Sequence, residues 1–119
     1  MIYEILYTVD FIGSFMKKNN LQIPNSKILE FKQALTYILI QNYVNIWDIH
    51  NPNKHKNLRS IKFNYYIDYQ VIKAWQNKNV NLPLNVANII FPTDLIIYCD
   101  PHCVTIEYKH STKILFQKL

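Results

Sequence analysis

The chain has 119 residues, half of them hydrophobic, and a formal net charge of +5 from 13 basic and 8 acidic side chains. This length and hydrophobic content predict one domain, residues 1–119, whose core needs no disulfide or metal to hold it. Gly13 is the sole glycine. Glycine-rich phosphate-binding loops are therefore excluded, because they need several glycines for a close backbone approach.

The positive charge is spread along the sequence. Arg59 is the one arginine among many lysines, whereas nucleic-acid surfaces usually cluster their charge and use the arginine fork. A lysine-rich solvated surface explains this pattern better than direct nucleic-acid contact. The first residues lack the basic leader of a signal peptide, and no run is long enough to span a membrane. Together with only two cysteines, this predicts reduced thiols in the cytoplasm and nucleus.

The N-terminal third predicts two amphipathic helices. Residues 2–18 carry apolar side chains at helical spacing, and Asn19-Asn20 should end this helix. A second helix should begin with Ser26 as N-cap and stop near Asn42-Tyr43. Joined by a short connection, the two helices should pack as an antiparallel hairpin. Their apolar faces should lie in the core: Ile2, Ile5, Leu6, Val9, Ile12 and Met16 on the first helix, and Ile28, Phe31, Leu35, Ile38 and Leu39 on the second.

The middle of the chain alternates loops with short elements. Asn, Pro and Lys dominate residues 48–57, which predicts an exposed loop before a strand at Ser60–Phe63. Asp68 can cap a short helix that runs to Trp75. Pro83 suits the first turn of another short helix, and Pro92 should end it.

The C-terminal third predicts an antiparallel meander. Two runs rich in β-branched and aromatic residues, Leu95–Cys99 and Cys103–Tyr108, are separated by Asp100-Pro101-His102, and a third run covers Ile114–Phe116. The predicted fold class is therefore α+β. An antiparallel helical hairpin and short helices should pack on one face of a small antiparallel sheet, formed by residues near 59–63, 95–99, 103–108 and 113–116.

Strand alternation selects candidate binding residues. Leu95, Ile97 and Cys99 should share the core face, which places Ile96, Tyr98 and Asp100 on the outer face. An exposed aromatic beside a rigid turn is a plausible binding anchor, since it supplies contact area at low entropic cost. A second buried face is the alternative. Leu58, just before the first strand, has the same two interpretations, and Trp47 should pack in the core.

Catalytic and metal sites have little support. Structural zinc usually has two paired ligand turns, whereas here Cys99, His102, Cys103 and His110 surround a single hairpin. No motif surrounds a pairing of either cysteine with a histidine, His50 and His55 included. Asp94 and Asp100 flank a strand, but turn-forming roles explain both. We therefore expect no enzyme activity, no metal and no cofactor.

Two sequence boxes resemble those of the BTG/Tob antiproliferative family. Residues 91–104 read Phe-Pro-x-Asp-Leu-x-x-Tyr-x-Asp-Pro-x-x-Val, similar to the family's second box, Leu-Pro-x-x-Leu-x-x-Trp-x-Asp-Pro-x-x-Val. The family's first box, Tyr-x-Gly-His-Trp-x-Pro-x-x-Pro-x-Lys-Gly-Ser-Gly-[Tyr/Phe]-Arg-Cys-Ile, aligns without a gap from residue 43, and Asp68 matches the Asp that follows it. The first-box matches are Tyr43, Trp47, Pro52, Lys54, Arg59 and Ile61. The departures are Asn45, Ile46, Ile49, His55, Asn57, Leu58 and Ser60.

The resemblance implies a non-enzymatic adaptor that binds the catalytic deadenylase subunit of the CCR–NOT complex. Such a protein promotes mRNA deadenylation and decay, and restrains proliferation or steers cell fate. The implied partner-binding residues are Leu58, at the family's aromatic position, Tyr98, at its Trp position, Asp100 and Pro101. The expected structural residues are Tyr43, Trp47, Arg59 and Asp68. RNA-binding proteins as further partners and homodimer formation stay open, and a basic nucleic-acid-binding module is the alternative function.

Overall fold

The computed structural model describes residues 1–17 and 22–118. Within these residues an α+β fold contains four α-helices, two short 3₁₀ helices and four strands, which confirms the predicted fold class. The α-helices are α1 (Ile2–Ser14), α2 (Asn25–Tyr43), α3 (Tyr69–Trp75) and α4 (Leu84–Ile90). The 3₁₀ helices are η1 (Val44–Ile46) and η2 (Lys56–Arg59), and the strands are β1 (Ser60–Phe63), β2 (Leu95–Asp100), β3 (Cys103–Tyr108) and β4 (Ser111–Gln117).

The two long helices form as predicted, but their boundaries differ. α1 ends at Ser14 and a turn follows it; the predicted stop at Asn19-Asn20 lies outside the described residues. The prediction of Ser26 as N-cap is wrong, because α2 begins one residue earlier, at Asn25. Pro24 occupies the N-cap position with φ −58° and ψ 141°, and its carbonyl accepts hydrogen bonds from the N–H groups of Lys27 and Ile28. The end of α2 at Tyr43 is confirmed.

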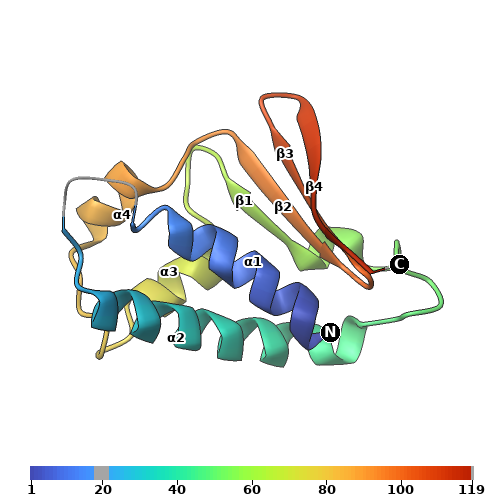
Figure 1. The fold of residues 1–119 in the computed structure, drawn as a ribbon, viewed down its shortest axis with the longest axis horizontal. Helices are drawn as coiled ribbons and strands as arrows, with labels where there is room; N and C mark the ends of the chain where they lie inside the picture. Colours follow the sequence, from blue (N-terminus) through green and yellow to red (C-terminus); the bar gives the residue numbers. More distant parts are fainter. Residues whose placement is uncertain (18–21, 119) are drawn as a thin grey trace.

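α1 lies between α2 and the sheet (Figure 1). α1 contacts β2, β3 and β4, whereas the main partners of α2 are α1 and α3. α1 therefore supplies most of the contact that the helical hairpin makes with the sheet. Most of the predicted core positions of both helices are at most 4% exposed, but Ile2 and Leu6 are each 43% exposed and Ile38 is only partly buried. None of the described helices is both long and apolar enough to cross a membrane.

The sheet is antiparallel throughout, with the strands in chain order. One row of paired residues crosses it from Ser60 through Tyr98 and Thr105 to Ile114. β4 starts at Ser111, two residues before the predicted boundary, since it pairs with β3 directly from their connecting turn.

The short helices close one end of the core. Asp68 caps α3 as predicted, because its Oδ1 accepts a hydrogen bond from the Gln70 N–H at 2.9 Å. Pro83 precedes α4 as its cap rather than forming part of its first turn. Trp75 stacks edge-on against Phe31 and Phe91, each at a centroid distance of 5.7 Å. This aromatic cluster joins both short helices to α2.

Candidate partner-binding surface

Strand β2 directs its side chains as the alternation predicted, but its last residue is buried. Leu95, Ile97 and Cys99 are at most 2% exposed and face the core. Ile96 and Tyr98 are partly exposed on the opposite face. Asp100 and Tyr98 both contact Lys56, as expected for residues on the same face, but at 5% exposed Asp100 is not accessible. It is buried by ion pairs with Lys56 and Arg59, which come from the segment preceding β1.

Arg59 holds the long loop before β1 against the end of β2. Its guanidinium is fully buried, and Nη2 donates hydrogen bonds to the carbonyls of Pro52 and Lys54 at 2.7 and 3.1 Å. The same nitrogen lies 3.2 Å from Asp100 Oδ1. A buried charge is tolerated only with such partners. Arg59 therefore determines how the loop lies, as a structural residue.

Trp47 lies at the start of this loop and is only partly buried, so the prediction of a core position is not met in full. The Arg59 guanidinium lies 5.6 Å from its ring centroid, a cation–π arrangement. The loop is also shorter than predicted, because Lys56 and Asn57 belong to η2 rather than to the loop. His55 precedes η2 with φ 61°, where the aligned family box has a glycine.

Leu58 and Tyr98 belong to neighbouring elements, η2 and β2, and together with Lys56 they define the candidate surface. Leu58 projects from η2 and is 63% exposed, and η2 lies against β2. Lys56, on the same short helix, places its ammonium 4.7 Å from the centroid of the Tyr98 ring and 2.9 Å from Asp100 Oδ2. Pro101 is buried. Asp100 and Pro101 thus form the frame of this surface, while Leu58, Lys56 and Tyr98 are its accessible part.

Lys56 is a residue that the motif comparison missed. The aligned box has a serine at this position, so the alignment already showed that a charged lysine replaces a neutral side chain here. Its contact with Tyr98 joins residues 42 positions apart and could not be read from either box alone. The lysine explains why the Tyr98 ring is partly covered.

The turn between β2 and β3 is tied to α1. His102 adopts φ 68°, and its N–H donates to Glu4 Oε2 at 2.9 Å. Glu4 is 5% exposed. Burial acts to raise the pKa of Glu4, but hydrogen bonds from the backbone and the nearby terminal ammonium outweigh it, so the pKa is lowered. An ionised Glu4 therefore fixes the turn that follows Asp100.

The alternative catalytic and zinc sites are not assembled. Among the described residues, no three His, Cys, Asp or Glu side chains gather as metal ligands would. Cys99 faces the core, and burial raises its thiol pKa to about 12, which keeps it protonated and unreactive. Both cysteines are free thiols. Asp94 precedes β2 and Asp100 ends it, so the two carboxylates lie at opposite ends of one strand.

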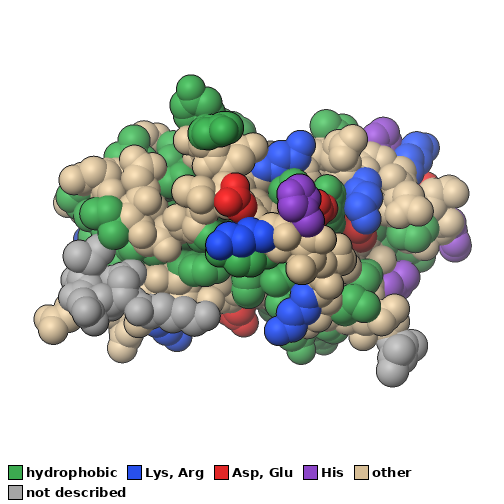
Figure 2. Space-filling model, turned by 90° about the horizontal axis from the view of Figure 1, so that it is seen from above, with side chains coloured by type: hydrophobic (Ala, Val, Ile, Leu, Met, Phe, Trp, Pro, Cys, Tyr) green, Lys and Arg blue, Asp and Glu red, His purple; other side chains and the backbone are tan. Residues whose placement is uncertain are grey.

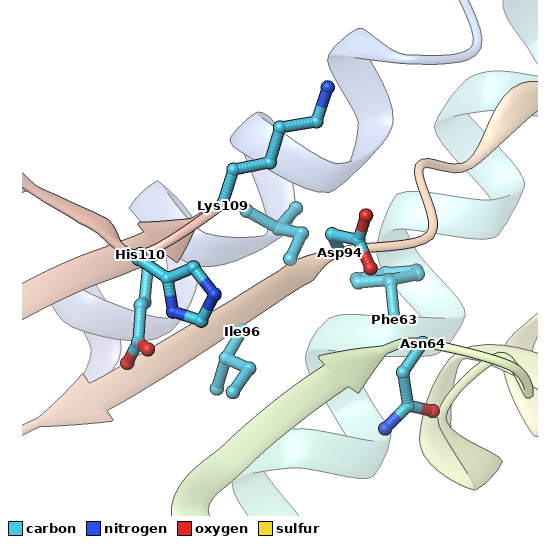
Figure 3. A pocket seen from close by; sticks show the side chains of 8 residues that line it. Phe63, Asn64, Asp94, Ile96, Lys109 and His110 are labelled. Atoms are coloured by element: carbon cyan, nitrogen blue, oxygen red, sulfur yellow. The ribbon is translucent and has the colours of Figure 1, made fainter.

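A separate pocket of about 350 Å³ lies at the other end of β2 (Figure 3). Phe63, Leu95 and Ile96 supply its apolar lining, and Asp94 and His110 lie on opposite sides of it. The Lys109 side chain points away from the pocket. The Asp94 carboxylate and His110 imidazole are therefore not arranged as an acid–base pair, and the pocket does not resemble an active site.

On the face shown in Figure 2, the charged side chains do not form a single basic block. Lysine and arginine side chains alternate there with acidic and histidine side chains. Nucleic-acid surfaces usually present a continuous basic stripe. This face therefore gives no support to the nucleic-acid alternative.

Comparison with known proteins decides the family. A family model described as the BTG family matches residues 1–117. The chain belongs to the BTG family. This confirms the resemblance seen in the two boxes, and it makes the chain a BTG-type protein.

The individual relatives are distant. Protein BTG3 of Sus scrofa, of Mus musculus and of Homo sapiens is in each case 27% identical over 107 residues. The alignment covers 88% of this chain and 40% of each relative, so the chain spans about 40% of the length of these curated relatives. A solved structure of a variant C. elegans FOG-3 BTG/Tob domain matches with a TM-score of 0.81 at 18% identity, covering 99% of this chain and 91% of that one. This match shows that the BTG/Tob fold is shared.

Proposed function

We propose that this BTG-family chain is a non-enzymatic adaptor that binds the catalytic deadenylase subunit of the CCR–NOT complex. By recruiting that subunit it promotes mRNA deadenylation and decay, and it restrains proliferation or steers cell fate. It acts in the cytoplasm and nucleus. The binding surface is the one formed by Leu58 and Tyr98 on the frame of Asp100 and Pro101.

One observation carries this proposal most strongly. Two of the four box positions that the resemblance assigns to partner contact, Leu58 and Tyr98, carry accessible apolar side chains, on η2 and on the outer face of β2. Leu58 is 63% exposed although it is a large hydrophobic residue. The surface is also preorganised, because buried Arg59 fixes the loop and Asp100 beneath it. A rigid aromatic side chain such as Tyr98 is a typical anchor of a protein interface.

Calorimetric titration of the domain into the purified deadenylase subunit tests the proposal. We expect saturable binding with one-to-one stoichiometry and only a mild dependence on salt, because apolar anchors dominate the contact. A single-stranded RNA titrated in parallel should not bind measurably at physiological salt. Absence of deadenylase binding would overturn the adaptor proposal. RNA binding that weakens steeply with salt would instead support the nucleic-acid module.

A further inference from the structure

Lys56 lies where it can influence the choice of partner. Its ammonium lies between the buried Asp100 carboxylate, at 2.9 Å, and the Tyr98 ring, whose centroid is 4.7 Å away. The side chain is 38% exposed. It therefore contributes to the frame of the surface and also remains accessible to a molecule that binds Leu58 and Tyr98.

The charges around Asp100 do not balance. Asp100 carries one negative charge, and two cations, Lys56 and the fully buried Arg59, both contact it. The three groups together are positive by one unit charge. An ammonium has three N–H donors, and the hydrogen bond to Asp100 Oδ2 uses one of them. Because Arg59 is buried and Lys56 is partly exposed, the excess charge is presented to solvent through Lys56.

We propose that Lys56 determines the chemistry of the partner: the surface around Leu58 and Tyr98 accepts a segment that carries an acidic side chain beside an apolar one. This inference rests on the proposed function and adds the charge that the partner must present. A partner that was apolar only would bury the Lys56 ammonium with Asp100 as its counter-charge, which Lys56 already shares with Arg59, and burying this excess positive charge is costly. A basic partner would be repelled. A carboxylate next to the anchor avoids both costs and adds electrostatic steering.

Neutral and charged replacements of Lys56 separate the effect of its charge on partner binding from the effect of its side-chain packing. Lys56→Met keeps most of the aliphatic stem but removes the charge, and Lys56→Arg keeps the charge. Against the purified deadenylase subunit at low salt, we expect Lys56→Met to bind about fivefold more weakly and Lys56→Arg to stay within about twofold of the parent. The difference between Lys56→Met and the parent should shrink at about 0.5 M salt, where an exposed ion pair is screened.

Lys54→Met is the matched control. Lys54 is an exposed lysine two residues away, and its replacement removes the same charge without touching Tyr98. It should bind within about twofold of the parent, since a specific pair needs close contact. Circular dichroism melts establish that each variant is folded, and Lys56→Gln serves as a second neutral variant if Lys56→Met does not fold.

The outcomes distinguish the two proposals. If the parent binds the deadenylase and Lys56→Met binds equally well, the acidic-partner inference is wrong while the adaptor function stands. Equal weakening by Lys54→Met and Lys56→Met would also overturn it, because net charge alone would then explain the effect. If the parent does not bind the deadenylase at all, both proposals fail.

Discussion

At the scale of single residues, Arg59 and Asp100 shape the candidate surface without belonging to its accessible part. Arg59 is 0% exposed and its Nη2 contacts two loop carbonyls and the Asp100 carboxylate. Neither side chain could serve a partner directly in this arrangement. Their matches to the family boxes are therefore explained by the geometry that they maintain around Tyr98.

Replacing Arg59 should destabilise the loop before β1 and its contact with Asp100. Arg59→Met leaves the carbonyls of Pro52 and Lys54 without their donor and leaves the buried Asp100 carboxylate with Lys56 as its remaining ion-pair partner. Breaking a buried ion pair by removing one member costs about 3–5 kcal/mol, and we expect a loss of this size in the free energy of unfolding. Urea denaturation measures it. A cost below about 1 kcal/mol, typical of exposed pairs, would show that Arg59 is not the organising residue.

Asp100 is also the residue whose burial the alternation did not predict. Period-two alternation describes a strand whose two faces differ only in solvent access. It contains no information about a cation brought from another element, and Lys56 and Arg59 lie at least 41 residues away in the chain. The burial of Asp100 and the position of Lys56 over Tyr98 are consequences of this long-range pairing. Tyr98 itself was placed correctly because its direction depends only on its own strand.

At the scale of elements, α1 and the β2–β3 turn are coupled through Glu4 and the His102 N–H. The pKa of Glu4 is lowered below its ordinary value of 4.5. A lowered folded-state pKa means that the ionised carboxylate stabilises the fold. This stabilisation is fully present above the unfolded-state pKa and is lost as the pH falls through the folded-state value.

Glu4→Gln tests this coupling. At pH 6 to 7 the variant should have a lower free energy of unfolding than the parent, because the amide cannot replace the charge-assisted bond to His102. Between pH 5 and about 3 the difference in the free energy of unfolding between variant and parent should narrow, because the Glu4 carboxylate of the parent becomes protonated. Urea denaturation across this pH range measures both curves. A difference that stays constant with pH would contradict the role of the Glu4 charge.

The two tryptophans differ in burial. Trp75 lies in α3, whereas Trp47 lies at the start of the loop before β1. Trp75 is 1% exposed, lies within the aromatic cluster, and its indole N–H donates to the Pro83 carbonyl at 3.1 Å. Trp47 is partly buried and contacts the Arg59 guanidinium. The sequence predicted a core position for Trp47, whereas Trp75 was only placed in a short helix. Only the packing in the folded structure distinguishes the buried Trp75 from the partly buried Trp47.

Alanine substitution should lower the free energy of unfolding more at Trp75 than at Trp47. Trp75→Ala should cost about 3–5 kcal/mol, the range for large aromatic truncations in cores. Trp47→Ala should cost clearly less, because part of its ring already contacts solvent. Denaturant unfolding of the two variants, with the parent alongside, gives both values. An equal or larger cost for Trp47→Ala would mean that Trp47 anchors the loop more firmly than its burial indicates.

At the scale of the whole molecule, the fold was predictable because helical and strand periodicities separate cleanly along this chain. Helix starts were less predictable: Pro24 displaced Ser26 as the cap of α2 because its φ and extended ψ already match the entry to a helix. The candidate surface was predictable in part, through Leu58 and Tyr98. Its third accessible residue, Lys56, required the three-dimensional arrangement.

The measurement that tests the central claim most directly is the affinity of Tyr98 variants for the purified deadenylase subunit. Tyr98 is partly exposed, so Tyr98→Ala should remain folded, with little change in a circular dichroism melt. Its affinity should fall at least about thirtyfold, as expected for removal of a central aromatic anchor worth about 2 kcal/mol. Tyr98→Trp, which introduces the family residue, should bind as well as the parent or better. Equal affinities for all three folded proteins would show that this surface is not where the partner binds.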